Sequence, residues 1–476
     1  MDKVSLILKT DSYKLTQFLQ QPKGTTAISS YISARKAGED TVFVGPQTFI
    51  KENLLTPVTL ADIEEAESYA MPHIGYFNKQ GWLDLVNKHG GYAPMLIESV
   101  DEGTVMPPQN VQLQAVNTDY KFAWLTGYLE TLALRDTWYM STVATRSRRM
   151  KEVIGKALVK TSDIPVEDQI NFKLHDFGAR AATSHQSASH GGLAHLVNFN
   201  GTDTLEGVVF ARRYYNDYMA GNSIPASEHS TITSWGREHE EDAHRNMVKV
   251  FGGKGKLLAS VSDSYDIYDT VRNIWGGSLA NEVRNSGGTV VVRPDSGDPV
   301  DVTVKVVNIL FEKFGYSVNS KGYKVLPDYI RVIQGGGVTM ENLPVIIDAL
   351  IAAGISIDNV AFGMGGALLQ DVARNDLGYV MKASAKRDAE GVWSDVYKDP
   401  ISGNKTSLKG RLGLINDCGV GSCSYKTVPK SIADKKGNLL LPRYHNGFVE
   451  NETDLASMRR RAAIDFSPKI TLSRYE

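Results

Sequence analysis

Residues 257–264 read LLASVSDS, a short apolar run that ends in Asp263 and Ser264 and is followed by a helical pattern. The same arrangement returns four more times before residue 387. The five runs are LLASVS, TVVV, YIRVIQ, NVAF and YVMKAS, at residues 257–262, 289–292, 329–334, 359–362 and 379–384. Parallel strands that are buried on both faces have this apolar, β-branched composition. In α/β barrels the loops after the carboxyl ends of such strands carry the functional side chains. The repeat therefore predicts an α/β barrel with its functional loops on one rim.

The chain is long enough for two domains, since its 476 residues exceed the roughly 250 to 300 residues at which a single core stops growing. Alternating strand and helix patterns predict a catalytic α/β barrel, irregular and TIM-like, over residues 146–386. Residues 1–145 mix short strand-like runs with helical stretches and predict an α+β domain. Turn clusters between short strands predict that residues 387–476 form an antiparallel segment that packs with this N-terminal domain.

Within these domains several elements can be assigned from local pattern. Strands are expected at 27–33, 95–99 and 111–116, and helices at 61–70 and from about Thr142 onward. The apolar run 196–199 is interpreted as a further strand that ends before Asp203. A basic run on the helix after Thr142 is interpreted as a solvated face.

Composition excludes several classes of function. Lys and Arg total 52 against 54 Asp and Glu, a net charge of -2, so general binding to nucleic acid or to an anionic membrane is not expected. No apolar run approaches the roughly 18 residues of a membrane helix, and the apolar stretch 4–8 is too short for a signal peptide. A cytoplasmic protein is therefore predicted. The only cysteines, Cys418 and Cys423, lack partners for a zinc site and are expected to be free thiols.

The densest group of chemically useful residues is RPDSG at 293–297, directly after a predicted strand. A guanidinium binds phosphate or carboxylate through a planar fork, and a carboxylate can hold Mg²⁺ together with its waters. An exposed Pro/Gly turn is the alternative. Because neighbouring barrel strands end at the same height, Asp263 and Asp295 are expected to lie together beside Arg293. This arrangement suits a magnesium-bound polyphosphate.

Three further segments end predicted strands with polar residues. In HDFGAR, residues 175–180, Phe177 could stack on a planar ring or pack in the core, and Arg180 could hold a phosphate. Asp203 could contact a ligand or cap the helix that starts at Leu205. His229 could act as a base or nucleophile, or form hydrogen bonds within its loop. The glycine clusters 335–337 and 363–366 have neither P-loop nor dinucleotide-binding spacing, although their backbone could approach a phosphate.

Taken together, these motifs resemble the nicotinamide phosphoribosyltransferases, which are type II phosphoribosyltransferases. The resemblance is carried by TDSYK at 10–14, HDFGAR at 175–180, GTDT at 201–204, EHST at 228–231, SDSYDIY at 262–268 and RPDSG at 293–297. It covers nearly the whole chain in the same order. It implies a pentosyltransferase of NAD salvage that condenses nicotinamide with 5-phosphoribosyl 1-pyrophosphate to nicotinamide mononucleotide and pyrophosphate. It also implies a homodimer with shared active sites.

The resemblance assigns roles to individual residues. Phe177 and the partner subunit's Tyr13 would sandwich the nicotinamide ring, and Asp203 would accept a hydrogen bond from the carboxamide NH₂. An ionised Asp203 in a closed pocket would also repel the carboxylate of nicotinate. Arg293 and Asp295 would hold ribose, phosphate and the amide side, while Asp263 and Asp295 would act through Mg²⁺ and water on the pyrophosphate.

The resemblance also assigns residues that would bind the phosphate groups of the substrate and a histidine that would react with ATP. Glycines that would receive the 5′-phosphate and ribose are Gly335, Gly336, Gly365 and Gly366. Basic residues that would surround phosphate and pyrophosphate are Arg35, Arg180, Arg374, Lys382, Lys398 and Lys405. His229 matches the histidine that the family phosphorylates from ATP, so ATP is expected to stimulate synthesis without donating the ribosyl group.

The chain departs from the family at a few positions. Gly336 stands where animal enzymes have an aspartate that contacts ribose, Met364 and Ala367 alter the second glycine cluster, and Val380 replaces a usual hydroxyl. Two alternatives stay open. One is a nicotinate phosphoribosyltransferase of the same fold, and the other is a catalytically silent nucleotide-binding dimer.

Overall fold

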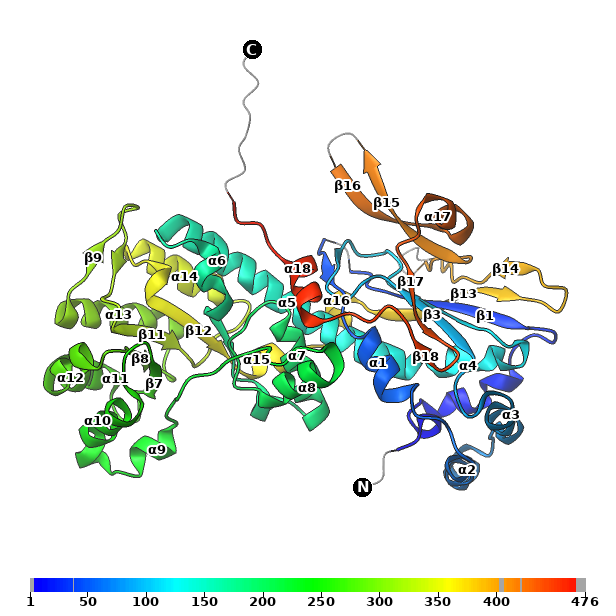
Figure 1. The fold of residues 1–476 in the computed structure, drawn as a ribbon, viewed down its shortest axis with the longest axis horizontal. Coiled ribbons are helices and arrows are strands. Elements are labelled where there is room, and N and C mark those ends of the chain that lie inside the picture. The colour runs from blue at the N-terminus through cyan, green and yellow to red at the C-terminus, as the bar shows by residue number, and fades with distance from the viewer. Residues whose placement is uncertain (1–3, 37, 402–405, 420–421, 468–476) are drawn as a thin grey trace, which may run out of the picture. The chain divides into compact units, whose positions relative to one another are not determined.

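The computed structural model describes residues 4–36, 38–401, 406–419 and 422–467. These residues form two compact units, shown in Figure 1. Unit 1 comprises Met1–Thr145, Arg213–Asp217 and Ala373–Ala462, and unit 2 comprises Arg146–Arg212, Tyr218–Val372 and Ala463–Glu476. The boundary at residue 145 falls within the long helix α5, Glu130–Thr161.

Unit 2 is built on a five-stranded parallel sheet with the order β6-β12-β11-β8-β7. Its strands are β6 (Leu174–Asp176), β7 (Leu257–Val261), β8 (Thr289–Arg293), β11 (Ile330–Gln334) and β12 (Val360–Met364), with a small β9/β10 hairpin (Ser317–Val318, Lys324–Val325). Its helices are α6 (Val166–Gln169), η4 (Ile170–Phe172), η5 (Ala179–Ala181), α7 (His185–Leu196), α9 (His229–Thr233), η6 (Arg237–His239), α10 (Glu240–Phe251), α11 (Ile267–Asp269), η7 (Thr270–Ser278), α12 (Ala280–Asn285), α13 (Pro299–Phe314), α14 (Leu343–Ala352), η8 (Ile357–Asn359) and α15 (Gly366–Leu369). Helix α8 (Leu205–Tyr215) belongs to unit 2 up to Arg212 and to unit 1 from Arg213.

The carboxyl ends of the parallel strands share one edge. Val261 of β7 is in register with Arg293 of β8, and Gly363 of β12 is in register with His175 of β6. Single parallel bridges extend the sheet beyond β6 through residues 201–202 and 222, and another joins residue 226 to β7. The barrel prediction is therefore confirmed in a coarser form, as a mixed α/β fold with a parallel half-barrel and a separate antiparallel sheet.

Short, well-capped connections keep the rim compact. After β8, the carboxylate of Asp298 accepts a hydrogen bond from the backbone N–H of Val300 at 2.9 Å, and Pro299 occupies the first turn of α13. Proline fits the first helical turn because its missing N–H would have no helical partner there. Only four residues separate β8 from the N-cap of α13, so Asp295 is held at the strand end.

Two strand predictions in this region are wrong. The fifth apolar run, at 379–384, lies in β13 (Val380–Arg387), which pairs antiparallel with β1 in unit 1 and not with the parallel sheet. An apolar run reports burial but does not specify the partner strand. The run 196–199 belongs to the end of α7 and the turn after it, and the isolated parallel bridges come later, at residues 201 and 202.

Unit 1 is built on an antiparallel sheet with the order β14-β13-β1-β5-β3-β17-β18. Its strands are β1 (Ala27–Ser33), β3 (Met95–Ser99), β5 (Leu113–Asn117), β13, β14 (Trp393–Asp395), β17 (Leu441–His445) and β18 (Phe448–Val449), with two further pairs, β2/β4 (Thr41–Val42, Val105–Met106) and β15/β16 (Leu412–Gly419, Ser422–Pro429). Its helices are η1 (Leu6–Leu8), η2 (Ser12–Leu19), α1 (Pro46–Asn53), α2 (Leu60–Ile74), α3 (Lys79–His89), η3 (Tyr120–Phe122), α4 (Ala123–Tyr128), α16 (Arg374–Leu377), α17 (Lys430–Lys436) and α18 (Leu455–Ala462).

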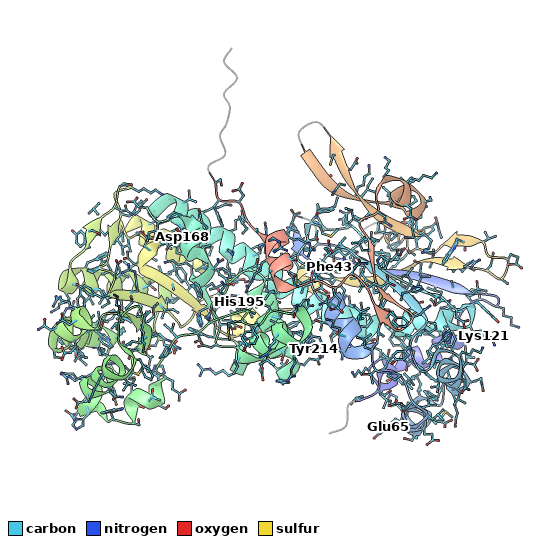
Figure 2. The ribbon with its side chains drawn as sticks, viewed as in Figure 1. Phe43, Glu65, Lys121, Asp168, His195 and Tyr214 are labelled. Carbon is cyan, nitrogen blue, oxygen red and sulfur yellow. The ribbon has the colours of Figure 1, made fainter. Side chains whose placement is uncertain are left out.

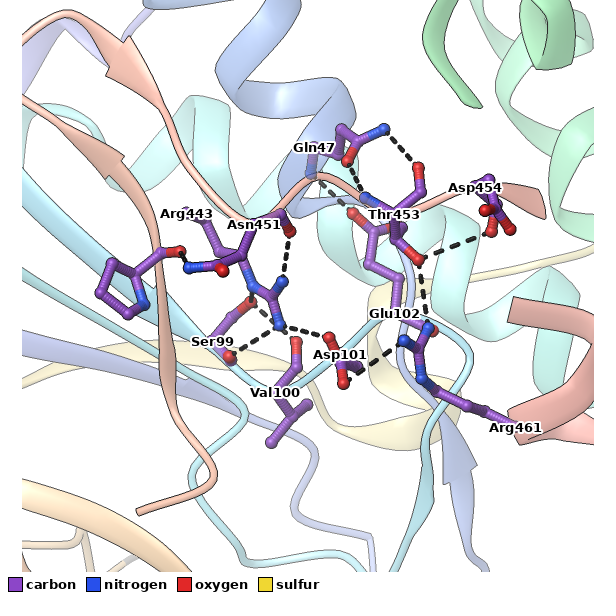
Figure 3. Close-up of polar contacts among 11 residues, drawn as sticks. Gln47, Ser99, Val100, Asp101, Glu102, Arg443, Asn451, Thr453, Asp454 and Arg461 are labelled. Atoms are coloured by element: carbon purple, nitrogen blue, oxygen red, sulfur yellow. Dashed lines mark hydrogen bonds and ion pairs between the residues drawn. The ribbon is translucent and has the colours of Figure 1, made fainter. Parts of the chain in front are cut away.

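The N- and C-terminal segments of unit 1 share one sheet and one core. Strand β17 pairs antiparallel with β3, and Phe43, labelled in Figure 2, is buried in a cluster that also contains Trp82 and Tyr444. Arg443 of β17 donates hydrogen bonds to Ser99 and contacts Asp101, as Figure 3 shows. The sequence-distant parts of the chain thus complete one another.

Two smaller expectations are also corrected. Helix α5 begins at Glu130 and not near Thr142. Cys418 is disulfide-bonded, so the expectation of a free thiol is wrong for this residue. Among the described residues, no helix combines the length and apolar character that a membrane crossing requires.

Candidate active site

The candidate site lies at the carboxyl edge of the parallel sheet in unit 2, where β6 supplies its first residues. The carboxylate of Asp176 is fully buried and accepts hydrogen bonds from the N–H of Gly178 at 2.7 Å and the hydroxyl of Thr202 at 3.3 Å. Burial raises the pKa of Asp176, against the opposing effect of these hydrogen bonds. Asp176 therefore holds the chain in the turn that follows β6.

This turn presents the ring of Phe177 above the sheet. The N–H of Phe177 donates to the carbonyl oxygen of Met364 at 2.9 Å. The Arg293 guanidinium lies 4.9 Å from the ring centroid, within the range of a cation–π contact. A Cβ atom at Gly363 would lie 2.0 Å from the ring, so only glycine leaves room for it. Phe177 also packs against the small cluster of Ala259, Val291 and Ile333 and is only partly buried, so it is both a packing residue and an available ring face.

Asp203 lies beside Phe177 and is fixed by two donors. Nε2 of His175 lies 3.0 Å from Oδ1 of Asp203, and the hydroxyl of Ser223 donates to the same oxygen. Burial favours a higher pKa for Asp203, but the hydrogen bonds from His175 and Ser223 and the charge of Arg293 outweigh it and lower the pKa. The carboxylate contacts these side chains and does not cap α8, so the capping alternative for Asp203 is not what the structure shows.

Arg293 and Asp295 form the centre of the rim. Nη2 of Arg293 lies 3.1 Å from Oδ1 of Asp295, with side chains 13% and 21% exposed. A Cβ atom at Gly335 would lie 2.7 Å from Nε of Arg293, and one at Gly336 would lie 1.9 Å from the carbonyl oxygen of Asp295. The first glycine cluster therefore allows its backbone to lie directly against the 293–295 loop.

Asp263 and His229 continue the rim on the side of β7. The N–H of Asp295 donates to Oδ2 of Asp263 at 3.3 Å, and Nε2 of His229 lies 2.9 Å from Oδ1 of Asp263. The side chain of Asp263 is 3% exposed, whereas that of His229 is 48% exposed. His229 is the first residue of α9, whose preceding residue Glu228 forms a capping box with Thr231. A buried carboxylate thus orients an imidazole that solvent can reach.

Arg180 and the second glycine cluster border the same turn. Arg180 is exposed on η5, and a Cβ atom at Gly366 would lie 3.5 Å from the Cβ of Ala181 on that helix. A Cβ atom at Gly365 would lie 3.6 Å from the carbonyl oxygen of Phe177. These are ordinary contacts, so the structure alone does not require glycine at 365 or 366.

The remaining predicted residues belong to unit 1. Tyr13 is 56% exposed and, together with Lys382, lines a cavity of about 260 Å³. Lys14 lines it as well and is ion-paired with Glu130 at 2.8 Å. The N–H of Arg35 donates to the carbonyl oxygen of Leu377, the last residue of α16, whose first residue is Arg374. Lys398 is exposed, and Lys405 lies outside the described residues.

Sequence reasoning missed two contacts of this site. His175 appeared only as part of a motif, and Ser223 was not singled out. Ser223 reaches Asp203 because residue 222 bridges to residue 201, a contact between segments that no local pattern reveals. Within the described part of the chain, no group of three or more His, Cys, Asp or Glu side chains is arranged to hold a metal ion.

Comparison with known proteins gives consistent matches along the chain. Residues 5–97 match the family model described as "Nicotinamide phosphoribosyltransferase, N-terminal domain". Residues 172–439 match that of the "Nicotinate phosphoribosyltransferase (NAPRTase) family".

Individual relatives extend these matches. A nicotinamide phosphoribosyltransferase of Xanthomonas campestris pv. campestris (strain 8004) is 48% identical over 462 residues, 96% of this chain and 98% of the relative. One of Acinetobacter baylyi is 28% identical and covers 84% of this chain and 86% of its own. The crystal structure of nicotinate-nucleotide pyrophosphorylase from Pyrococcus furiosus has a TM-score of 0.61 at 18% identity, covering 97% of this chain and 96% of that chain, and supports the fold. The chain therefore belongs to the nicotinate phosphoribosyltransferase (NAPRTase) family.

Proposed function

We propose that this protein is a nicotinamide phosphoribosyltransferase, which condenses nicotinamide with 5-phosphoribosyl 1-pyrophosphate to nicotinamide mononucleotide and pyrophosphate in NAD salvage. The relative at 48% identity over 96% of the chain has this name. Within the site, the assignment of nicotinamide as the substrate rests on Asp203, whose side chain is 41% exposed and whose pKa is lowered by the hydrogen bonds from His175 and Ser223 and by the charge of Arg293. An ionised carboxylate accepts a hydrogen bond from the carboxamide NH₂ and repels the carboxylate of nicotinate.

The remaining rim residues fit the transfer step. Substitution at an anomeric carbon that bears pyrophosphate passes through an oxocarbenium-like state, so the protein must hold the nucleophile in line and neutralise the leaving group. The pyridine nitrogen of nicotinamide already has a free lone pair and needs no general base. We assign Phe177 to stacking on the ring, Asp203 to fixing its rotation, and Arg293 to charge neutralisation.

Magnesium fits the donor set at the strand ends. Mg²⁺ usually takes one or two carboxylates, keeps several waters and is completed by substrate phosphates. Asp263 and Asp295 follow adjacent strands and are linked by the 3.3 Å contact to Oδ2 of Asp263. These two residues would hold the ion through water, and it would supply charge neutralisation for pyrophosphate.

We also propose that ATP acts through His229. The imidazole is 48% exposed and is oriented by the carboxylate of Asp263. Imidazole nitrogen can act as a covalent nucleophile, so this arrangement suits phosphorylation from ATP. His229→Ala is expected to abolish any stimulation by ATP, and unchanged stimulation in this variant would contradict the assignment.

The phosphate end of the site is proposed to involve a second copy of the chain. We propose a homodimer in which the partner subunit's Tyr13 covers the nicotinamide ring. Basic residues proposed for phosphate and pyrophosphate are Arg35, Arg180, Arg374, Lys382, Lys398 and Lys405, and glycines proposed for phosphate and ribose are Gly335, Gly336, Gly365 and Gly366. The exposure of Tyr13 and the lysine-lined cavity beside it support this arrangement. Analytical ultracentrifugation tests it, and a fully active monomer would contradict it.

The function itself is tested by product analysis. Purified protein is incubated with 5-phosphoribosyl 1-pyrophosphate, Mg²⁺ and either nicotinamide or nicotinate, each with and without ATP. Nicotinamide mononucleotide is the expected product. Nicotinate mononucleotide as the main product would instead identify a nicotinate phosphoribosyltransferase, and no product from either substrate would favour a silent binder.

Asp203→Asn tests the assignment of the amide contact. The neutral side chain no longer repels a carboxylate, so the preference for nicotinamide over nicotinate, as the ratio of kcat/KM values, is expected to fall at least about tenfold. Asp301→Asn is the matched control, because Asp301 is 67% exposed on α13 and contacts only the surface residue Lys305 among the ion pairs of the described chain. An unchanged preference in Asp203→Asn would refute the assignment.

A further inference from the structure

The carboxylate of Asp203 is held asymmetrically. Both of its side-chain donors, Nε2 of His175 at 3.0 Å and the hydroxyl of Ser223, contact the same oxygen, Oδ1. Among the described residues no protein group donates to Oδ2. One oxygen is therefore occupied by the protein, while the other is left to accept from a ligand.

His175 is itself rigidly placed. It lies in the central position of β6, in parallel register with Gly363 of β12. Its ring lies 5.1 Å from that of Phe177 at an interplanar angle of 49°, and its side chain is only 12% exposed. A Cβ atom at Gly201 would lie 2.7 Å from Nδ1 of His175, so the backbone at residue 201 packs closely against the ring at this nitrogen. The imidazole therefore has little freedom to turn away from Asp203.

Several hydrogen bonds attach the loop that carries Asp203 to β6. The N–H of Asp203 donates to the carbonyl oxygen of Asp176 at 2.9 Å, and the His175 contact fixes the side chain. The charged groups that face this pair are Arg293, whose charge favours ionised Asp203, and the buried carboxylate of Asp176, which interacts with His175. Without His175 and Ser223, burial would act on Asp203 with only Arg293 to oppose it.

We propose that His175, assisted by Ser223, is a positioning residue that directs Oδ2 of Asp203 toward the ligand amide and thereby sets the preference for nicotinamide over nicotinate. This inference rests on the proposed function. His175 does not contact the reacting atoms in this scheme. It acts only through Asp203, and it is the donor at Nε2, not the aromatic ring as such, that is required.

Two substitutions of His175 separate the donor from the shape of the side chain. His175→Leu removes the donor and keeps similar bulk, whereas His175→Gln retains an N–H donor of comparable reach. In His175→Leu the KM for nicotinamide is expected to rise on the order of tenfold, since a hydrogen bond to a charged group is lost. The kcat is expected to change little, because the contact serves ground state and transition state alike. His175→Gln is expected to recover most of the affinity.

The pH profile supplies a readout that a merely structural role would not alter. A carboxyl group with a lowered pKa stays ionised down to acidic pH and loses its charge as the pH falls through that pKa. Removing His175 or Ser223 leaves burial less opposed and raises the pKa of Asp203. The nicotinamide preference of His175→Leu and Ser223→Ala is therefore expected to fall at a higher pH than that of the wild type.

The matched control is a second histidine–carboxylate pair in unit 2. Nδ1 of His185 lies 2.6 Å from Oε1 of Glu206, but the His185 side chain is 80% exposed. His185→Leu is expected to leave KM, substrate preference and pH profile unchanged. Steady-state kinetics with both substrates from about pH 3, below the ordinary pKa of an aspartate, up to pH 9, together with circular dichroism of each variant, complete the test.

The possible outcomes are distinguishable. A wild type that forms no nicotinamide mononucleotide overturns the proposed function, whereas an active wild type whose His175→Leu variant keeps its KM and preference overturns only this inference. Equal impairment of His175→Leu and His175→Gln would also overturn it, because the ring and not the donor would then matter. If His175→Leu does not fold, Ser223→Ala decides, and an unchanged pH profile in that variant would reject the proposal.

Discussion

At the scale of single residues, the rim depends on positions where no side chain fits. Gly336 is the clearest case, because a Cβ atom there would lie 1.9 Å from the carbonyl oxygen and 2.5 Å from the carbonyl carbon of Asp295. These are backbone atoms, so a flexible side chain cannot simply move aside. The 293–295 loop and the first glycine cluster therefore lie so close together that this backbone leaves no room for a side chain at residue 336.

Gly336→Ala is therefore expected to displace Asp295. Overpacking of this kind typically costs about 1 to 3 kcal/mol, and here the displacement falls on a proposed active-site residue. The kcat/KM for 5-phosphoribosyl 1-pyrophosphate is expected to fall at least about tenfold. Gly277→Ala is the control, because a Cβ atom at Gly277 would lie 3.6 Å from its nearest neighbour, the carbonyl oxygen of Arg272. Equal activity of the two variants would show that the loop adjusts freely.

The sequence predicted the residues of this site only in part. The apolar run before Asp263 and that before Asp295 suffice to place two carboxylates at adjacent strand ends, because parallel strands fix a common edge. The run gives no information on side-chain direction after the strand ends. Whether Asp203 contacts a ligand or caps a helix could not be decided from the sequence. It depends on the isolated bridge between residues 201 and 222, which brings Ser223 to the carboxylate of Asp203.

At the scale of elements, helix α1 is capped by a residue distant in sequence. Its N-cap, Gly45, has no side chain to accept from the first turn. Oε2 of Glu102 accepts from the N–H of Gly45 at 2.9 Å and from the hydroxyl of Tyr215 at 2.9 Å, while Oε1 accepts from the N–H of Gln47 at 2.7 Å. Figure 3 shows Glu102 beside Gln47. A negative charge at this helix end also interacts favourably with the helix dipole.

Glu102→Gln is expected to destabilise the protein. Both carboxylate oxygens of Glu102 accept hydrogen bonds. In glutamine an NH₂ group, which is a donor, would replace one of these acceptors and would face another donor, at a cost of about 1 to 3 kcal/mol in unfolding free energy. Burial raises the pKa of Glu102 against its hydrogen bonds. A raised pKa in the folded state contributes stability that is present at low pH and lost as the pH rises through it. The difference in unfolding free energy between wild type and Glu102→Gln is therefore expected to narrow from pH 5 to pH 8.

Urea denaturation at both pH values measures this difference. Glu67→Gln serves as the control, since Glu67 pairs with Lys79 at the surface, with side chains 34% and 48% exposed. Such a pair contributes about 1 kcal/mol or less. A Glu102→Gln variant as stable as this control would show that the cap is dispensable.

Helices and strands were easiest to predict where the spacing of apolar residues in the sequence matches the residues that are buried in the structure. Strands β1 and β3 have the predicted bounds. Helix α5 was predicted to start too late because its first half buries hydroxyls that periodicity counts as polar. Thr137 and Thr142 lie in this half, and their hydroxyls donate to the carbonyl oxygens of Ala133 and Trp138, four residues earlier. Such back-bonding satisfies a buried hydroxyl inside a helix without altering the sequence pattern.

At the scale of the whole molecule, unit 1 is completed by its C-terminal segment. Strand β17 covers the edge of β3, and the buried side chains of Leu440, Leu455 and Met458 belong to the same part of the chain. Turn clusters between short strands predicted antiparallel pairing in this part of the chain, and its strands pair antiparallel. The turn clusters could not indicate which strand is covered, since that depends on contacts far apart in sequence.

Arg443 makes the polar contacts that join β17 to the strand and loop around Ser99 and Asp101. It is 7% exposed and donates to the carbonyl oxygens of Ser99 and Asn451, while Nη2 lies 2.8 Å from Oδ1 of Asp101 (Figure 3). Arg443→Met keeps much of the aliphatic bulk but leaves these acceptors without their donor. A loss of about 2 to 3 kcal/mol in unfolding free energy is expected, measured by urea denaturation. Lys426→Met is the control, because the Lys426–Asp417 pair is more than half exposed on both sides and should contribute about 1 kcal/mol at most. If both variants lose equally little, the C-terminal segment is held by its apolar contacts alone, and the polar network only specifies its register.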